Sequence, residues 1–410
     1  MLSSRYAPLA RVVLLTGLSL NAFMAWKDGD LVRKGYPDFT IFYSAGTMVR
    51  PGMAGSLYDE RAEFQTQRQF APEVSIRHGA LPYNHPPFEA LLFVPLSFLP
   101  YLPAYLVWDA VNLGLLVLAL LLLPCHIPLL QTKPLWVWVL CAVAFFPIFV
   151  CLLQGQDMIV FFFLLAAVYG SLKNGADFRA GCWLGMGLFR PHLVLPLAVI
   201  LLLSGRRKAV LGVASCALVM AGISIAVIGW RGFLDYPGYV WRLEQIMGRG
   251  AIVPDNMPNL RGFLAIFFRD GHPTALALGA TGSICLLILA IWIFRSAQHA
   301  GNLELGFSAA ILVTILISYH AFIYDLGLLL LPALLLLGEE MRRKHWELIV
   351  PIVVLFFTPL LMFLWLRLSH LNFLTPVLFL WLWGMARDSS LLKGGSRDPY
   401  PRVASVAPLI

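Results

Sequence analysis

The sequence predicts an all-α polytopic membrane protein. Of its 410 residues, 59% are hydrophobic and 13% are charged, and the mean hydropathy is +0.78. Soluble domains are about 45–50% apolar and about 25% charged, so this chain has too few polar side chains to cover a soluble core. Long apolar runs recur to the C-terminal region, and lipid satisfies no backbone polar groups, so the spanning segments are expected to be helices.

About twelve apolar segments predict about 10–13 transmembrane helices, since a full span needs roughly 17–25 residues. Their ranges are 8–26, 87–100, 103–124, 134–153, 157–172, 179–203, 208–229, 274–295, 304–319, 321–338, 346–366 and 371–387. Arg5 and Arg11 precede or begin the first run, and no small-residue cleavage site follows it, so a retained helix is expected rather than a signal peptide. Residues 1–390 are therefore predicted to form one integral-membrane domain.

The basic residues predict the orientation, because loops rich in lysine and arginine stay in the cytoplasm. Such clusters are "SGRRK" (204–208), "GEEMRRKH" (338–345) and the tail at 391–410. Two long loops, 27–86 and 230–273, then lie on the extracytoplasmic side. The side on which "QGQD" (154–157) lies is left open, because prolines nearby can produce half-helices. The net charge of +8 is attributed to orientation, and no nucleic-acid partner is expected.

The first external loop is expected to contain amphipathic helices. In "FTIFYSAGTMV", Phe39, Phe42, Tyr43 and Gly46 recur at intervals of three and four residues, which is typical of one helix face. The stretch at 60–70 is similar but more polar. Such helices can lie in the membrane interface with the aromatic side toward lipid.

Asp38 stands just before this aromatic helix and has two interpretations. Aspartate at such a position commonly caps a helix by accepting backbone N–H bonds. Alternatively, a carboxylate beside an apolar wall at the membrane surface can serve as a general base.

Three further residues of this loop are candidates for substrate binding, each with a structural alternative. Tyr58 and Asp59 belong to "SLYDE", which alternatively forms a solvated turn. His85 precedes two prolines that suit a first helical turn. It would stand at the membrane surface, where a ring nitrogen can meet a polar head group, although a lone histidine is more often structural.

Ionisable residues within the apolar segments need a partner or a function, because inserting each costs roughly 2.5–3.5 kcal/mol. They are Asp109, Asp157, Arg190, His192 and Asp325. Arg190 and His192 flank Pro191, which interrupts a helix and frees backbone groups. A broken helix that carries a cation is a candidate anion site. The alternative is an ion pair between Arg190 and an aspartate inside the bundle.

The order of several short motifs resembles glycosyltransferase family 87, the bacterial membrane mannosyltransferases that use polyprenol-phosphate-mannose. The motifs are an external Asp after the first helix, "LYD", a "PP" helix start, "GQ-D", a basic residue before proline, an "N…R" loop and "SYHAFIYDLGLLLLP". The resemblance covers residues from about 35 to 340. It implies a GT-C fold, an active site facing the extracytoplasmic side of the bacterial inner membrane, and inversion at the anomeric carbon.

The resemblance also implies roles for individual residues. Asp38 falls on the catalytic aspartate. Arg190, with His192 and Arg261, is expected to bind phosphate. The remaining matched positions are expected to contact substrate: Tyr58, Asp59, His85, Gln156, Asp157, Asn256, His320, Tyr324 and Asp325. This sequence departs from the family pattern at His85, where an aromatic residue is more usual, and at Asp157 and Arg190, which replace Asn and Lys.

The predicted function is transfer of a hexose, mannose by resemblance, from a polyprenyl-phosphate sugar to a glycolipid or glycan acceptor. The chemistry needs a base for the acceptor hydroxyl and a cation for the leaving phosphate. No set of acids has the sequence spacing of a divalent-metal site, and the six cysteines show no metal-ligand spacing, so no metal or cofactor is expected. The alternatives are a transporter or lipid flippase, which would explain buried charges, and a non-catalytic scaffold, which would not.

Overall fold

The computed structural model describes residues 7–73, 81–247, 254, 257–268, 271–343, 346–359, 361 and 373–394. All regular structure within these residues is helical, and no strand occurs among them. This confirms the predicted all-α class. The hydrophobic runs of this sequence form helices because only a helix satisfies its own backbone polar groups in an apolar medium.

Within the described part of the chain, three helices are long and apolar enough to cross a membrane: α5 (Tyr101–Leu122), α11 (Arg207–Met247, of which 207–243 is the candidate span) and α13 (Pro273–His299). A fourth candidate is the pair α6 (Leu135–Ala144) and α7 (Phe146–Gln154), which is bent by 77° at Phe145. Pro147, in the first turn of α7, has no backbone N–H to continue α6, which accounts for the break. The chain is therefore a polytopic membrane protein.

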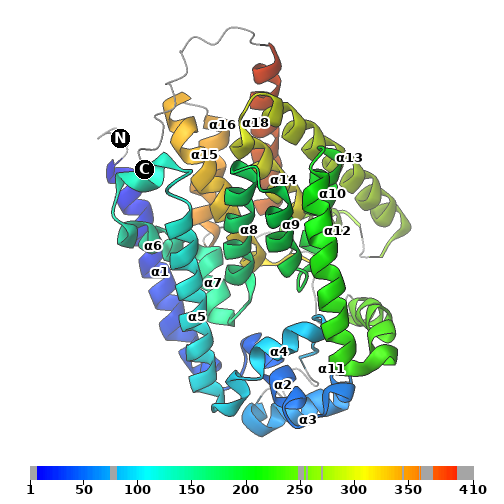
Figure 1. Ribbon diagram of the computed structural model, residues 1–410. Helices are drawn as coiled ribbons and strands as arrows, with labels where there is room; N and C mark the ends of the chain where they lie inside the picture. The colour runs from blue at the N-terminus through cyan, green and yellow to red at the C-terminus, as the bar shows by residue number, and fades with distance from the viewer. Residues whose placement is uncertain are drawn as a thin grey trace, which may run out of the picture.

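The other helices of the core are shorter or less apolar. They are α1 (Ala7–Arg33), α8 (Met158–Lys173), α9 (Asp177–Met186), α10 (Pro191–Leu203), α12 (Leu260–Ala265), α14 (Leu303–Ile317), η7 (Ile323–Leu329), α15 (Leu330–Arg343), α16 (Trp346–Phe356) and α18 (Leu374–Gly394), with the 3₁₀ turn η5 (Pro128–Thr132) after α5. Helices α7, α8, α10, α14 and α15 contribute most of the buried apolar cluster. Figure 1 shows α15, α16 and α18 at one end of the molecule and α2, α3 and α4 at the other.

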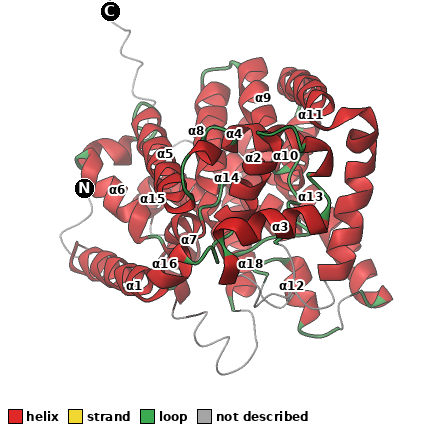
Figure 2. Cartoon of the chain, turned by 90° about the horizontal axis from the view of Figure 1, so that it is seen from below, coloured by secondary structure: helices red, strands yellow, loops and turns green. Residues whose placement is uncertain are grey.

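The region between the first long helix and α5 is built from short helices. These are α2 (Phe39–Val49), η1 (Ala54–Ser56), α3 (Glu60–Phe70), η3 (Pro87–Glu89), α4 (Ala90–Phe93) and η4 (Leu96–Phe98). Seen from below, α2, α3 and α4 lie across the end of the helical core (Figure 2). The expectation of a transmembrane helix at 87–100 is wrong, since Pro95 and Pro100 divide this segment into three short pieces. Helix α1 also continues to Arg33, past the predicted end at residue 26.

The aromatic face of α2 packs against protein. Phe39 and Phe42 are fully buried, and their rings contact Phe93, Tyr101 and Tyr105 at centroid distances of 4.7–6.4 Å. The predicted periodicity is confirmed, but the expectation that this face meets lipid is wrong. An aromatic stripe gains the same burial from α4 and α5 as it would from a bilayer.

The two predicted external loops contact each other. Helix α11 changes direction at Gly229, where φ is 77°, and its second half reaches the α2–α4 region. The Tyr236 hydroxyl donates a hydrogen bond to the Asn84 carbonyl at 3.0 Å, and the rings of Tyr58 and Tyr236 lie 5.2 Å apart. Residues 230–247 are therefore mostly helical rather than an open loop, and they lie at the same end of the molecule as the first loop.

Candidate active site

Asp38 is held by a side chain from a distant segment. It precedes α2, yet its carboxylate makes no capping hydrogen bond to that helix, so the helix-cap interpretation of its side chain is wrong. Its Oδ2 instead accepts a hydrogen bond from Nε2 of Gln156 at 2.7 Å. The backbone N–H of Asp38 donates to Oε1 of Gln154 at 3.2 Å. The side chain and the backbone N–H of Asp38 are thus both hydrogen-bonded to the turn that follows α7.

This turn is shaped by Gly155. Its φ of 61° lies in the left-handed region, and a Cβ there would come within 2.7 Å of the Phe39 side chain. The Trp108 indole donates to the Gly155 carbonyl at 2.9 Å, and the Tyr105 hydroxyl donates to that of Leu152 at 2.8 Å. Two side chains of α5 therefore position the turn, and the bend between α6 and α7 places "QGQD" on the Asp38 side of the core.

Arg190 completes a chain of polar contacts that begins at Asp38. Its Nη2 donates to Oε1 of Gln156 at 2.5 Å, and its Nε and Nη2 donate to the carboxylate of Asp157. Gln156, Asp157 and Arg190 are each at least 95% buried as whole residues. Among the described residues, no hydrogen bond involves Nη1 of Arg190, so this nitrogen remains available to an anion. Pro191 begins α10 directly afterwards, as the sequence predicted for an interrupted helix.

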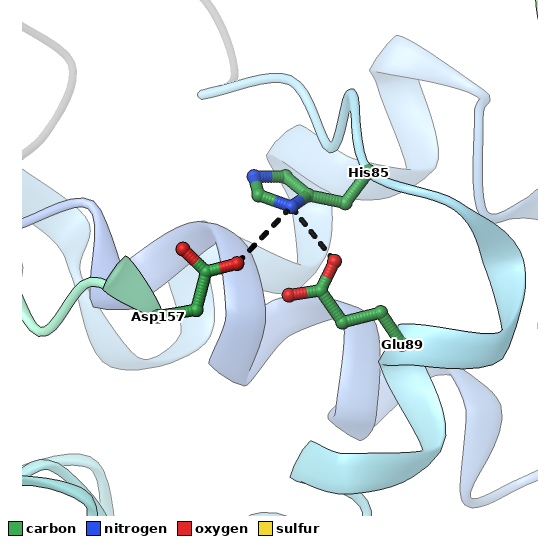
Figure 3. A group of neighbouring side chains, drawn as sticks. All are labelled: His85, Glu89 and Asp157. Carbon is green, nitrogen blue, oxygen red and sulfur yellow. Dashed lines mark hydrogen bonds and ion pairs between the residues drawn. The ribbon is translucent and has the colours of Figure 1, made fainter. Parts of the chain in front are cut away.

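A second buried acid lies beside the ion pair of Arg190 and Asp157. Glu89, in η3, is fully buried, and its Oε2 is 2.7 Å from Nδ1 of His85 (Figure 3). The same ring nitrogen is 3.9 Å from Oδ2 of Asp157. Burial and the charge of Arg190 lower the pKa of His85 to about 3, and burial and the charge of Asp157 raise the pKa of Glu89 well above its ordinary range. Both shifts favour the uncharged form of each group.

Residues of the motif "SYHAFIYDLGLLLLP" lie around the same polar side chains. Tyr324 and Asp325 lie in η7 and are buried, and the Asp325 carboxylate accepts a hydrogen bond from the Phe322 N–H at 2.6 Å. The guanidinium carbon of Arg190 is 5.9 Å from the centre of the Tyr324 ring. His192 and His320 are within electrostatic range of Arg190 and Asp325, respectively. Segments 38, 85–89, 156–157, 190–192 and 320–325 thus converge on one region.

The comparison with protein families agrees with this geometry. The family model described as glycosyltransferase family 87 matches residues 83–321, which is more than half of the chain. The chain belongs to glycosyltransferase family 87. The matched region contains His85, Glu89, Gln156, Asp157 and Arg190. No curated protein and no solved structure matches the chain.

Membership of family 87 makes the chain a membrane glycosyltransferase with a sugar donor and an acceptor. This decides against a transporter, a flippase or a scaffold as its function. A glycosyl transfer needs a proton acceptor and a stabiliser for the leaving group. The network offers a carboxylate at Asp38 and a guanidinium at Arg190, joined through a single glutamine.

Two predicted residues of this family 87 chain lie outside the network. Asp59 is exposed and caps α3, since its Oδ1 accepts hydrogen bonds of 2.9 Å from the N–H groups of Arg61 and Ala62. Arg261 donates to the Tyr319 carbonyl at 3.2 Å and stacks on the Tyr319 ring at 3.9 Å. Asn256 lies outside the described residues. Tyr58 is mostly buried and donates to the His85 carbonyl at 2.9 Å, so it supports the loop that carries His85.

Arg261 also lines an apolar pocket of ≈ 280 Å³ between α12, α13 and the end of α14. Leu264, Leu276 and Leu316 form part of its wall, and Ser318 and Tyr319 lie at its polar end. The pocket adjoins the turn at 318–320 and contains no member of the Asp38–Arg190 network. Asn259 ties this turn to α12 by donating to the Ser318 carbonyl at 2.7 Å.

Sequence reasoning missed Glu89, Gln154 and Glu63. The signal for Glu89 was its position as an acid inside the apolar segment 87–100, where an ionisable residue needs a partner. Gln154 stands two residues before the recognised Gln156. Glu63 is fully buried in α3 and accepts a hydrogen bond from the Tyr83 N–H at 2.9 Å. Nothing in the sequence distinguishes Glu63 from its exposed neighbours Glu60 and Arg61.

Proposed function

We propose that this protein transfers a hexose, with mannose as the first candidate, from a polyprenyl-phosphate sugar to a hydroxyl of a glycolipid or glycan. The reaction takes place at the extracytoplasmic face of the bacterial inner membrane. The observation that carries this proposal is the buried chain of contacts from the Asp38 carboxylate through Gln156 to Arg190. It holds a base and a cation in one arrangement that does not depend on bound substrate.

In the proposed reaction, Asp38 removes the proton of the acceptor hydroxyl as its oxygen bonds to the anomeric carbon. The bond from that carbon to the phosphate oxygen breaks, and its electron pair leaves with polyprenyl phosphate. One direct displacement of this kind inverts the anomeric configuration. Gln156 is proposed to orient the carboxylate of Asp38 by donating a hydrogen bond to its Oδ2.

Arg190 is proposed to stabilise the leaving phosphate. Its Nε and Nη2 are engaged by Asp157 and Gln156, which fixes the plane of the guanidinium and directs Nη1 to the ligand. A guanidinium held in a fixed plane can donate to a phosphate oxygen with its remaining N–H groups. His192 and Arg261 are proposed as further phosphate contacts, and Tyr58, His85, Asp157, Asn256, His320, Tyr324 and Asp325 as substrate contacts.

The lipid part of the donor is proposed from the surroundings of the site. The pocket beside Arg261 is walled by leucine, alanine and phenylalanine side chains, which suit an isoprenoid chain. The guanidinium of Arg261 lines this apolar pocket, and this arrangement suits a lipid that carries one phosphate group.

The test is an assay of the purified protein in detergent or nanodiscs. A panel of polyprenyl-phosphate sugars, including mannose, glucose and arabinose, is offered together with membrane glycolipid acceptors. Transfer from one lipid-linked sugar, and none from the corresponding nucleotide sugar, supports the proposal. Transfer from a nucleotide sugar alone overturns the donor class.

A further inference from the structure

We propose that His85, Glu89 and Asp157 form a binding site for one divalent transition-metal ion, Mn²⁺ or Zn²⁺. Each residue offers one ligand atom, and these atoms lie within 4.8 Å of one another. All three side chains are at least 93% buried. Figure 3 shows the ring of His85 and the two carboxylates directed toward a common point. The proposal replaces the sequence-based expectation of a site without metal.

The chemistry of the three groups favours an ion of this class. An imidazole nitrogen with two carboxylate oxygens is a mixed donor set that suits Zn²⁺ or Mn²⁺ better than Mg²⁺, which prefers oxygen alone. Ligand atoms bound to one such ion at about 2.0–2.2 Å lie roughly 3–4 Å apart. Nδ1 of His85 is already 2.7 Å from Glu89 and 3.9 Å from Asp157, so small side-chain rotations are sufficient.

The unsatisfied oxygen of Glu89 is a second observation that points to a ligand. Among the described residues, Oε1 of this fully buried carboxyl accepts no hydrogen bond, and the carboxyl meets Asp157 favourably only when a proton lies between the two acids. An unpaired carboxylate oxygen in the interior is costly, and buried acids are usually paired or bound to metal. Figure 3 places this oxygen on the Asp157 side of the group, where an ion would satisfy it.

The closeness of the two acids leads to the same proposal. Glu89 and Asp157 both lie beside Nδ1 of His85. Two carboxyl groups that share a buried site repel each other when both are ionised. A divalent cation between them would offset this repulsion.

The second role of the ion rests on the proposed function. Three protein ligands leave at least one coordination position open, as in metal sites that bind a substrate atom. Asp157 would bridge the ion and Arg190, so the open position lies near Nη1 of Arg190. We infer that it takes an oxygen of the donor phosphate, which places the ion and the guanidinium on the same leaving group.

Metal content tests the site without any assay of sugar transfer. The full-length protein is stripped with a chelator, loaded with Mn²⁺ or Zn²⁺, dialysed and measured by plasma mass spectrometry. About one ion per chain is expected, and Glu89→Gln and His85→Phe should each lower the affinity at least tenfold. Glu63→Gln is the matched control, because Glu63 is an equally buried acid of the same region. The proposal is overturned if the wild type holds no more metal than Glu89→Gln.

A spectroscopic measurement covers the case in which these variants fail to fold. Pulsed electron paramagnetic resonance of Mn²⁺ bound to the wild type should show one directly coordinated nitrogen, from His85. A bound ion without coordinated nitrogen overturns the site as assigned.

The role in catalysis is separated by a third measurement. If chelation removes the metal and leaves transfer unchanged, the phosphate role is wrong while the metal site stands. If no polyprenyl-phosphate sugar is a donor, the proposed function fails and the metal measurements are unaffected.

Discussion

Gln156 links Asp38 to Arg190. Its amide nitrogen donates to the Asp38 carboxylate at 2.7 Å, and its amide oxygen accepts from the Arg190 guanidinium at 2.5 Å. A neutral amide can donate to a carboxylate and accept from a guanidinium at the same time. The proposed base and the proposed phosphate ligand are therefore positioned by the same residue, and each can be tested separately.

Asp38→Asn is expected to lower transfer by roughly a hundredfold to ten-thousandfold, which is the range for loss of an acid–base group. The amide keeps the size of the side chain but does not accept the proton. Turnover of the purified variant measures the effect. Asp59→Asn is the matched control, since asparagine caps a helix as well as aspartate does and this site is exposed. Normal turnover of Asp38→Asn would mean that a residue other than Asp38 is the general base.

Gln156→Leu should reduce kcat/KM by about 10- to 100-fold. It removes two hydrogen bonds to charged groups, each of which contributes about 1.5–3 kcal/mol, and the variant retains part of this through water. Gln154→Leu serves as the comparison, because Gln154 accepts a hydrogen bond from the backbone N–H of Asp38. Equal losses in the two variants would indicate that the turn, and not the carboxylate contact, is what matters.

Arg190→Lys is expected to retain part of the activity and Arg190→Met almost none. Lysine keeps the charge but not the planar fork that Asp157 and Gln156 hold. Donor binding and turnover are both measured, and binding should weaken in the methionine variant.

The double variant Arg190→Met/Asp157→Asn separates two roles of Arg190. The structure shows that Arg190 compensates the charge of Asp157, so Arg190→Met alone leaves an unpaired buried acid and should express poorly. The double variant should express better yet still fail to transfer sugar. Recovery of transfer along with expression would contradict a phosphate role.

Stability of the α3 region should fall as the pH rises from about 4.5 to about 8. Burial raises the pKa of Glu63 to about 8 from 4.5, so the folded state binds more protons than the unfolded state within this interval. The free energy of unfolding therefore decreases with pH until Glu63 is ionised in both states. Amide hydrogen exchange of residues 60–70, measured as a function of pH, reports this loss of stability. Glu63→Gln should remove the pH dependence, and an unchanged profile in that variant would assign it to another group.

Gly46→Ala should destabilise the packing of α2 on α4. A Cβ at Gly46 would lie 2.5 Å from the backbone of Phe93, which has no rotamer to move. Overpacking of this kind costs about 1–3 kcal/mol. Gly114→Ala in α5 is the control, because a Cβ there meets no atom within 4 Å. Thermal unfolding in detergent should distinguish the two, and equal shifts would argue against close packing at Gly46.

Part of the candidate site was predictable from local pattern. The interrupted helix at Arg190 and Pro191 and the "QGQD" turn carry polar residues within apolar runs, and such residues need partners wherever they are buried. The identity of the partners was not predictable. In the sequence, Arg190 could pair with any of several aspartates. In the structure, α6 and α7 are bent by 77°, and the turn after α7 places Asp157 and Gln156 beside Arg190.

The sequence by itself determined the helical membrane class, the amphipathic face of α2 and the family to which the chain belongs. These follow from hydropathy, periodicity and motif order, which are local properties of the chain. Only the tertiary structure decided that the aromatic face of α2 meets protein and not lipid, that Asp59 is a surface cap, and that Glu89 joins His85 and Asp157. The reason is physical: whether a side chain is buried, and which charge it meets, depends on helices that are distant in sequence, and no local pattern encodes their angles.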